Sequence, residues 1–160
     1  MELYKGFYDT PIGILEVSAD DEALTSVSFL FEKPEKTKTN RLVEEALFQL
    51  KAWFAGTLTT FDLPLHQRGT AFQQKVWNLL PQIEFGKTTS YGALALQLGD
   101  KNLMRAVGAA NGANPFAIIV PCHRVIGSGG SLVGYAGGLP RKKWLLEFEG
   151  AEGVNQLSLF

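Results

Sequence analysis

The chain has 160 residues, of which 46% are hydrophobic and 19% charged. This length suits one ordinary domain or two small ones, and the apolar content can bury a core, which excludes a large multidomain assembly and a generally disordered chain. The formal net charge is −1, so the overall balance does not indicate a nucleic-acid-binding protein. The charges are unevenly distributed, however. Residues 1–68 carry a net charge of −4 and residues 69–150 a net charge of +4, so a polyanion would prefer the second part.

Cysteine content and hydropathy indicate a cytoplasmic protein. Cys122 is the single cysteine, so the chain can form neither an internal disulfide nor a Cys-rich zinc site, and we expect no metal and no other cofactor. No N-terminal stretch has the apolar core of a signal peptide. The apolar run at residues 116–120 is far too short to span a bilayer. We therefore expect no membrane association.

Residues 1–68 are predicted to form a small antiparallel sheet with one helix, an N-terminal α/β domain. Three segments have the composition of strands and are separated by turn-forming residues: 3–8, 14–17 and 24–30. From Arg41 to Phe54 apolar side chains recur every three or four residues, which predicts an amphipathic helix. Asn40 is the expected N-cap of this helix, and residues 66–69 are the expected linker to the next domain.

Residues 69–150 are predicted to form a second, mainly helical domain, followed by a tail at residues 151–160. Three helices are expected, at residues 70–80, 91–98 and 102–113, with a strand at residues 116–120. A short turn containing Gly99 separates the last two helices, as in a helix-turn-helix motif, although two packed core helices would give the same pattern.

The third of these helices has almost no side chain over most of its surface. Gly108 and Gly112 inside it cost about 1 kcal/mol each relative to alanine, so small residues must bring a compensating advantage. Close packing against another protein helix is one explanation. The other is close approach of the backbone to a nucleic-acid groove, with Arg105 as the long cationic side chain.

Cys122 stands in a segment whose neighbours suggest chemistry. A lone cysteine is usually a small buried hydrophobic residue, but His123 and Arg124 beside it can favour the reactive thiolate. Glycine-rich stretches at residues 127–130 and 134–138 suit a closely approaching ligand. These residues alone leave three classes of protein open: a cysteine hydrolase, a redox sensor and an acceptor of a transferred group.

Several motifs, in the same order along the chain, resemble those of the methylated-DNA–protein-cysteine methyltransferases, also called 6-O-alkylguanine-DNA alkyltransferases. They are Thr-Ser-Tyr-Gly-Ala-Leu-Ala at 89–95, Arg-Ala-Val-Gly at 105–108, Asn-Pro at 114–115, Pro-Cys-His-Arg-Val at 121–125 and Gly-Tyr-Ala-Gly-Gly at 134–138. The resemblance is specific over residues 69–150 and is nearest to the bacterial single-protein form. It implies an α+β fold whose C-terminal domain is a winged-helix-like helix-turn-helix domain.

The resemblance implies DNA repair by direct, irreversible transfer of the alkyl group of 6-O-methylguanine, and also of 4-O-methylthymine, to Cys122 after the nucleotide has been flipped out of the duplex. His123 would act as base through a bound water, and Glu149 would orient and charge-compensate it. Asn114 would hold the active-site turn. Tyr91 would press on the phosphate beside the target and support proton donation to the leaving guanine.

The same resemblance implies binding to alkylated double-stranded DNA through the minor groove, with low sequence specificity, by a monomeric protein. Arg105 would fill the space that the flipped nucleotide leaves in the stack. Further expected DNA contacts are Ala106, Ala109, Ala110, Ala113 and Arg124.

A substrate pocket is implied as well. The backbone at Cys122 and Val125 would accept hydrogen bonds from the guanine edge, and Tyr135 and Gly137 would form a wall. Ala136 stands where some relatives have a hydroxyl residue, so a hydrogen bond to guanine at that point must come from a backbone N–H.

The last five residues resemble the peptide motif that binds the bacterial DNA sliding clamp. The residues that would occupy the clamp groove are Gln156, Leu157, Leu159 and Phe160. A frayed terminus, or a tail folded back on its own domain, is the simpler explanation.

Two alternatives to repair are kept open. One is a DNA-binding regulator whose cysteine senses alkylation or oxidation. The other is a cysteine hydrolase, which is disfavoured because adjacent side chains such as Cys122 and His123 usually point apart. The basic run at residues 141–143 is expected to be either a solvated helix face or a set of phosphate contacts.

Overall fold

The computed structural model describes residues 3–151, which form two compact units. The first unit consists of residues 3–67 together with Pro115–Ile119, and the second of residues 68–114 and 120–151. The segment at residues 116–120 was expected to belong to the second domain, residues 69–150, but most of it lies in the first unit. None of the helices in the described part of the chain is long and apolar enough to cross a membrane.

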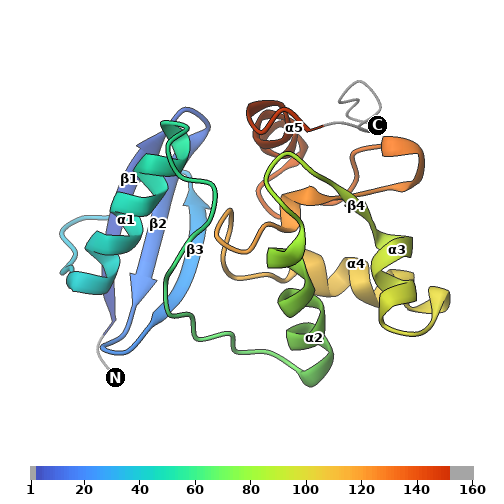
Figure 1. Cartoon of the computed structure of the whole chain (residues 1–160). Helices are drawn as coiled ribbons and strands as arrows, with labels where there is room; N and C mark the ends of the chain where they lie inside the picture. The colour runs from blue at the N-terminus through green and yellow to red at the C-terminus, as the bar shows by residue number, and fades with distance from the viewer. Residues whose placement is uncertain (1–2, 152–160) are drawn as a thin grey trace. The chain divides into compact units, whose positions relative to one another are not determined.

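The first unit contains a three-stranded antiparallel sheet (Figure 1) in the order β1-β2-β3. The strands are β1 (Tyr4–Thr10), β2 (Gly13–Ala19) and β3 (Leu24–Leu30). Gly6 pairs with Val17, and Val17 pairs in turn with Val27. Both valines are buried, so one face of the sheet supplies the core.

Helix α1 (Arg41–Phe54) packs on β1 and β2 of this sheet. The predicted cap is confirmed, because the backbone N–H of Val43 donates to Asn40 Oδ1 over 2.9 Å. The packing is close at Gly6, where a Cβ atom would lie 2.6 Å from Val43 Cγ1. Any side chain there would force the side chains of Val43 and Leu47 to shift.

The prediction of a strand at residues 116–120 is wrong. Phe116 makes an isolated parallel bridge with β3, in which Val27 N donates to Pro115 O and Ala117 N donates to Val27 O, both over 2.9 Å. Beyond it the chain turns, and Ile118 has a φ of 70°, in the left-handed region. Phe116, Ile118, Ile119 and Val120 are buried in the core, so the hydrophobicity of this run reflects burial in a turn.

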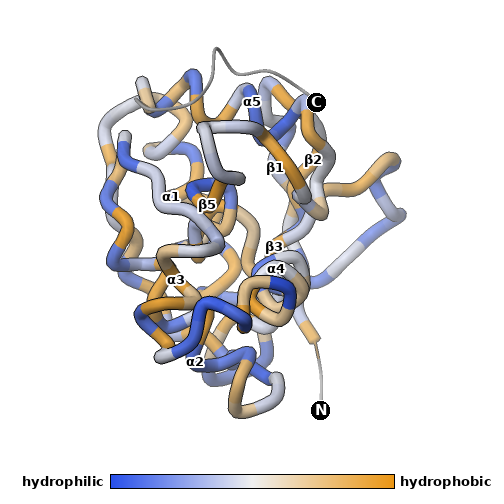
Figure 2. The backbone as a smooth tube through the Cα atoms, turned by 90° about the vertical axis from the view of Figure 1, so that its right-hand side faces the viewer, coloured by the Kyte–Doolittle hydropathy of each residue, from blue (hydrophilic) through white to orange (hydrophobic). Residues whose placement is uncertain are grey.

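The second unit is mainly helical. Its α-helices are α2 (Ala71–Leu79), α3 (Tyr91–Gln97), α4 (Met104–Gly112) and α5 (Leu139–Phe148). The three helices expected from the sequence are therefore confirmed, with ends displaced by one or two residues. Thr70 and Gln73 form a capping box at the start of α2, and Figure 2 shows both hydrophilic and hydrophobic stretches in this part of the chain. The observed fold class is α+β, as expected.

Two very short strands complete the second unit. Strands β4 (Thr89–Ser90) and β5 (Val125–Ile126) pair in parallel. A turn of 3-10 helix, Lys101–Leu103, joins α3 to α4. Helix α4 packs against α2, where Trp77 Nε1 donates to the carbonyl oxygen of Ala110 over 2.8 Å.

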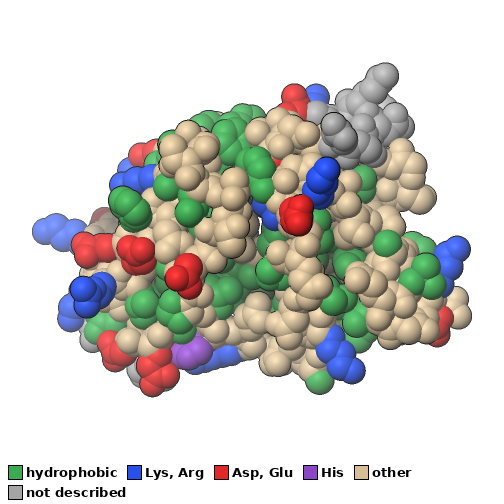
Figure 3. Space-filling model, in the orientation of Figure 1, with side chains coloured by type: hydrophobic (Ala, Val, Ile, Leu, Met, Phe, Trp, Pro, Cys, Tyr) green, Lys and Arg blue, Asp and Glu red, His purple; other side chains and the backbone are tan. Residues whose placement is uncertain are grey.

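Acidic side chains are prominent in the first unit. On the face shown in Figure 3, Asp and Glu side chains gather over it, in keeping with the net charge of −4 that residues 1–68 carry. A polyanion would therefore be repelled by this unit.

Candidate active site

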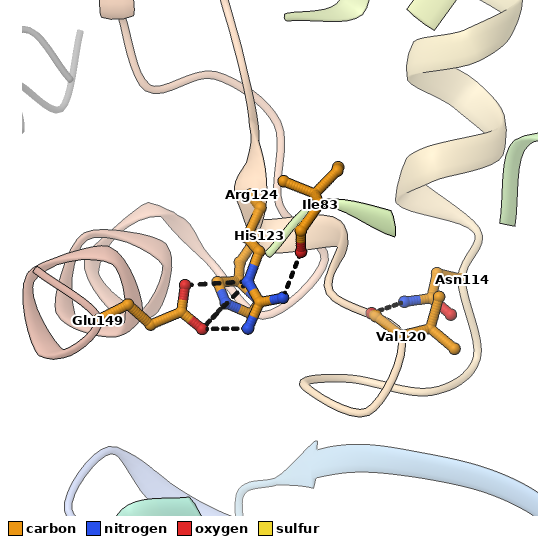
Figure 4. A network of polar contacts seen from close by, with 6 residues as sticks. All are labelled: Ile83, Asn114, Val120, His123, Arg124 and Glu149. Carbon is orange, nitrogen blue, oxygen red and sulfur yellow. Dashed lines mark hydrogen bonds and ion pairs between the residues drawn. The ribbon is translucent and has the colours of Figure 1, made fainter. Parts of the chain in front are cut away.

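Cys122 begins a short turn of 3-10 helix, Cys122–Arg124, that leads directly into β5. The backbone N–H of Cys122 donates to Val120 O over 2.8 Å, and the N–H of Val125 closes the turn on Cys122 O. Asn114 Nδ2 also donates to Val120 O over 2.8 Å (Figure 4). Asn114 thus holds the chain two residues before the nucleophile candidate, which is the place the resemblance implied for it.

The thiol of Cys122 is buried, with 5% of the residue exposed. Burial raises the pKa of this thiol above its ordinary value, while a hydrogen bond from the Asn114 side chain and the positive charge of Lys142 lower it in part. The expectation that His123 and Arg124 favour the thiolate is therefore not met. The groups that do so are Asn114 and Lys142, and the resting thiol keeps its proton at neutral pH.

His123 and Glu149 form a buried pair (Figure 4). The ring Nε2 of His123 lies 3.0 Å from Glu149 Oε2. Burial lowers the pKa of His123, more than Glu149 raises it. Burial alone would raise the pKa of Glu149, but hydrogen bonds and charges from His123 and Arg124 bring it below its ordinary value. A neutral imidazole beside an ionised carboxylate is an arrangement that can accept a proton and stabilise the resulting charge.

Arg124 belongs to the same network and not to the surface. Its Nη2 donates to Glu149 Oε2 over 2.6 Å, its Nε donates to Glu149 Oε1 over 3.0 Å, and its Nη1 donates to Ile83 O over 2.6 Å. The residue is 5% exposed. Its predicted role as a DNA contact is therefore wrong, because the guanidinium is already used to hold Glu149.

Lys142 is a site residue that sequence reasoning missed. The residue is fully buried, and its Nζ donates to Val125 O over 2.6 Å, to Val133 O over 2.8 Å and to Gly134 O over 3.3 Å. Burial lowers the pKa of the amine to about 8. Both sequence-based expectations for this lysine, a solvated face and a phosphate contact, are thus wrong. The available signal was its spacing to Leu145 and Leu146, three and four residues on, which places it on the apolar face of α5.

Tyr91 and Tyr135 lie around the same loop. The Tyr91 hydroxyl donates to Val133 O over 3.0 Å, and burial, followed by the charge of Cys122, raises its pKa. The Tyr135 hydroxyl is buried and has no hydrogen-bond partner within residues 3–151, and burial raises its pKa well above the ordinary value.

Of the other expected pocket residues, Val125 is fully buried, Gly137 is half-buried and Ala136 is exposed.

Helix α4 divides the residues that were expected to face DNA. Four of them are exposed on one side of the helix or just beyond it: Arg105, Ala106, Ala109 and Ala113. Ala110, in contrast, is 3% exposed and faces α2 through the bond from Trp77. Its predicted DNA contact is therefore wrong. The expected sliding-clamp residues, 156–160, lie outside the described part of the chain.

Both parts of the chain match family models. Residues 3–67 match 6-O-methylguanine DNA methyltransferase, ribonuclease-like domain, and residues 71–151 match 6-O-methylguanine DNA methyltransferase, DNA binding domain.

Curated relatives match over nearly their whole length. A methylated-DNA–protein-cysteine methyltransferase of Mycobacterium tuberculosis is 48% identical over 157 residues, covering 95% of each chain. Another from Methanosarcina acetivorans is 45% identical over 155 residues, covering 93% of this chain and 99% of the relative.

Solved structures agree with these relatives. The M. tuberculosis O6-methylguanine methyltransferase has a TM-score of 0.84 at 47% identity, covering 93% of each chain. The M. tuberculosis OGT in complex with DNA has a TM-score of 0.81 at 46% identity, covering 96% of this chain and 98% of that one. On the combined evidence of both domains, the chain belongs to the family of methylated-DNA–protein-cysteine methyltransferases.

Proposed function

We propose that this protein repairs DNA by transferring the alkyl group of 6-O-methylguanine to Cys122. The observation that carries the proposal is the buried constellation of Cys122, a neutral His123 and an ionised Glu149 within one unit. In the transfer, Cys122 Sγ attacks the alkyl carbon and a thioether bond forms. The bond between that carbon and the guanine oxygen breaks, its electron pair stays on the oxygen, and a proton completes the restored base.

The site's residues share the proton movement. Because the pKa of Cys122 is raised and that of His123 is lowered, both groups are neutral before reaction, and the thiol must lose its proton as it attacks. With Nε2 directed at Glu149, Nδ1 is the ring atom that takes this proton, through a water in the proposed mechanism. The charge of Glu149 then stabilises the imidazolium.

The transfer is irreversible and each molecule acts once. A thioether has no good leaving group, and the chain has no second cysteine that could take the alkyl group away. The product is therefore an alkylated protein and not a regenerated enzyme.

Duplex DNA would lie along the exposed side of α4. The small exposed side chains there let the helix enter the minor groove without offering many hydrogen-bonding groups to the bases, so sequence specificity is low. Arg105 would fill the gap left by the flipped nucleotide, and Tyr91 would press on the neighbouring phosphate. The supporting observations are the exposure of Arg105 and the net charge of +4 on residues 69–150.

The flipped base would enter between the Cys122 turn and the loop that Lys142 holds. The backbone carbonyl of Val125, which accepts one bond from Lys142, would accept a hydrogen bond from the guanine edge, and Tyr135 with Gly137 would form the wall. The carbonyl of Cys122 already accepts two hydrogen bonds, from Val125 N–H and from Asn111 Nδ2. Ala136 is exposed and has no side-chain donor. This supports a backbone N–H as the group that would donate a hydrogen bond to guanine at this position.

Intact-mass measurement after mixing with a methylguanine duplex tests the proposal. Repair adds one methyl increment to the protein at Cys122 and restores guanine in the DNA, and Cys122→Ser removes both effects. Many product molecules per protein would instead indicate a hydrolase, and an unrepaired base would indicate a sensor. The same assay with a methylthymine duplex tests 4-O-methylthymine as the second substrate.

A further part of the proposal concerns residues 156–160, which resemble a sliding-clamp-binding peptide. Tethering to the clamp would raise the local concentration of this cytoplasmic, monomeric protein on newly made DNA. A calorimetric titration with the clamp, comparing the full chain with one that ends at Asn155, tests this. Equal binding by both chains, or by neither, would contradict it, and truncation should leave transfer on a short duplex unchanged.

A further inference from the structure

Asn111 is the only polar side chain among the buried residues of α4, and the proposed mechanism does not use it. The residue is 2% exposed. Its Nδ2 donates to the backbone oxygen of Cys122 over 3.2 Å. Helix α4 exposes Arg105 on one side, and on its buried side Asn111 bonds it directly to the backbone of Cys122.

The amide of Asn111 is only half satisfied. Because its partner is a carbonyl oxygen, the atom facing Cys122 must be the donor Nδ2, and Oδ1 must point away. Oδ1 is buried and has no hydrogen-bond partner within the described residues. A buried acceptor without a partner destabilises the folded protein, and an apolar residue on this face of α4 would avoid that cost. Stability alone therefore does not explain an asparagine here.

The bond from Asn111 fixes the direction of one peptide group. Cys122 O also accepts the N–H of Val125, which belongs to the same short turn. Val125 therefore fixes the shape of the turn, whereas Asn111 fixes the turn relative to α4. Burial raises the pKa of Tyr91, and the Asn111 side chain offsets part of that rise, so the amide lies near both Cys122 and Tyr91.

We propose that Asn111 is a positioning residue that holds the backbone of Cys122, and through it Sγ, in register with α4. The inference rests on the proposed function, in which the guanine lies between the Cys122 turn and the loop that Lys142 holds, and Sγ attacks its alkyl carbon. Attack requires the reacting atoms about 3–3.5 Å apart and aligned, and a displacement of about 1 Å can cost about 100-fold in rate. Rotation of the Cys122 peptide would move Sγ on this scale.

Asn111→Leu removes the donor. We expect the transfer rate to fall about tenfold to 100-fold, and by the same factor for a methylguanine duplex and for free benzylguanine, since one sulfur attacks both. DNA affinity, measured in the Cys122→Ser background, should stay unchanged. Asn102→Leu is the matched control, because Asn102 is exposed in the 3-10 turn before α4, and it should react with benzylguanine at the wild-type rate.

Asn111→Asp keeps the size of the side chain and makes the donor depend on pH. A carboxylate cannot donate to Cys122 O, whereas a protonated carboxyl group can. The rate of this variant on benzylguanine, divided by the wild-type rate, should therefore rise as the pH falls. The corresponding ratio for Asn111→Leu should stay flat, as should that for Asn102→Asp. Because its volume is conserved, Asn111→Asp also provides the test if Asn111→Leu fails to fold.

Wild-type rates in folded Asn111 variants would overturn the inference, as would a pH-independent ratio for Asn111→Asp. A loss of rate that follows the fraction of unfolded protein would also overturn it, since it would show a purely structural residue. A wild-type protein that transfers no alkyl group from either substrate would instead overturn the proposed function, and the inference with it.

Discussion

The two units bury polar groups in different ways. In the first unit the one ionisable side chain that is buried within residues 3–67 is Asp20, which accepts hydrogen bonds from the N–H groups of Glu22 and Ala23 and contacts His66 Nδ1 over 2.8 Å. The second unit buries four ionisable side chains close to the candidate nucleophile: His123, Arg124, Lys142 and Glu149. Burying a charge costs several kcal/mol unless it is well paired. The second unit therefore carries the larger cost of buried charge, and the groups that cause this cost surround the candidate nucleophile.

The largest effect is expected from Glu149→Gln, which breaks the buried network. Arg124 would lose its anionic partner, so we expect the free energy of unfolding to fall by about 3–5 kcal/mol. The transfer rate on benzylguanine should fall about 100-fold or more, because general-base catalysis through His123 contributes about 10²–10⁴. Urea unfolding and single-turnover kinetics measure the two quantities.

Glu16→Gln is the control for that comparison. Glu16 lies in the first unit and faces Lys5 over 3.7 Å in a partly exposed pair. Its loss should cost less than about 1 kcal/mol and should leave the transfer rate unchanged. Similar losses in both variants would show that the two units do not differ in the way described.

Arg105→Ala separates DNA handling from chemistry within the second unit. Because Arg105 is exposed on α4 and lies outside the buried network, its loss should slow repair of a methylguanine duplex about tenfold or more, as flipping costs a few kcal/mol. The rate on free benzylguanine, which needs no flipping, should stay unchanged. Equal losses on both substrates would show that Arg105 supports the fold or the thiolate instead.

The pH dependence of transfer reports His123 directly. Its pKa is lowered in the folded protein, so the imidazole remains a neutral base as the pH falls through 6.5, its ordinary value. The rate on benzylguanine should decline only below that pH. The unfolded chain, in contrast, takes up a proton at this histidine near its ordinary pKa, so the free energy of unfolding should begin to fall at higher pH than the rate. A rate that declines at or above the ordinary value would contradict this order.

The smallest effect on transfer is expected from Gly6→Ala in the first unit. The new Cβ would lie 2.6 Å from Val43 Cγ1, and overpacking of this kind costs about 1–3 kcal/mol. The transfer rate per folded molecule should not change. Gly56→Ala is no matched control, because Gly56 has a positive φ of 79°. Thr57→Ala provides a control instead, because Thr57 is exposed just after α1 and its hydroxyl makes an exposed hydrogen bond to Ala52 O.

Local sequence determined the helices, their caps and the identity of the nucleophile candidate. Asn40 caps the helix that its position predicted, and Thr70 and Ser90 cap two further helices in the same way, because capping depends on groups three residues apart. The motif around Cys122 indicated the family, and the family models match both parts of the chain.

Tertiary structure decided which polar residues became part of the site. The sequence alone does not show which side of a helix or loop other elements will cover. This holds for the basic run at residues 141–143, for the small-residue helix α4 and for the apolar run at residues 116–120. Lys142, Asn111 and Arg124 became internal donors because α5, α4 and the Cys122 turn bury them. Residues 116–120 became a turn because Phe116 pairs with β3, a contact between segments far apart in the chain. Such burial and such hydrogen bonds arise only when segments that are distant in the sequence meet. They set the pKa values of the site residues and the orientation of the groups that take part in the proposed chemistry.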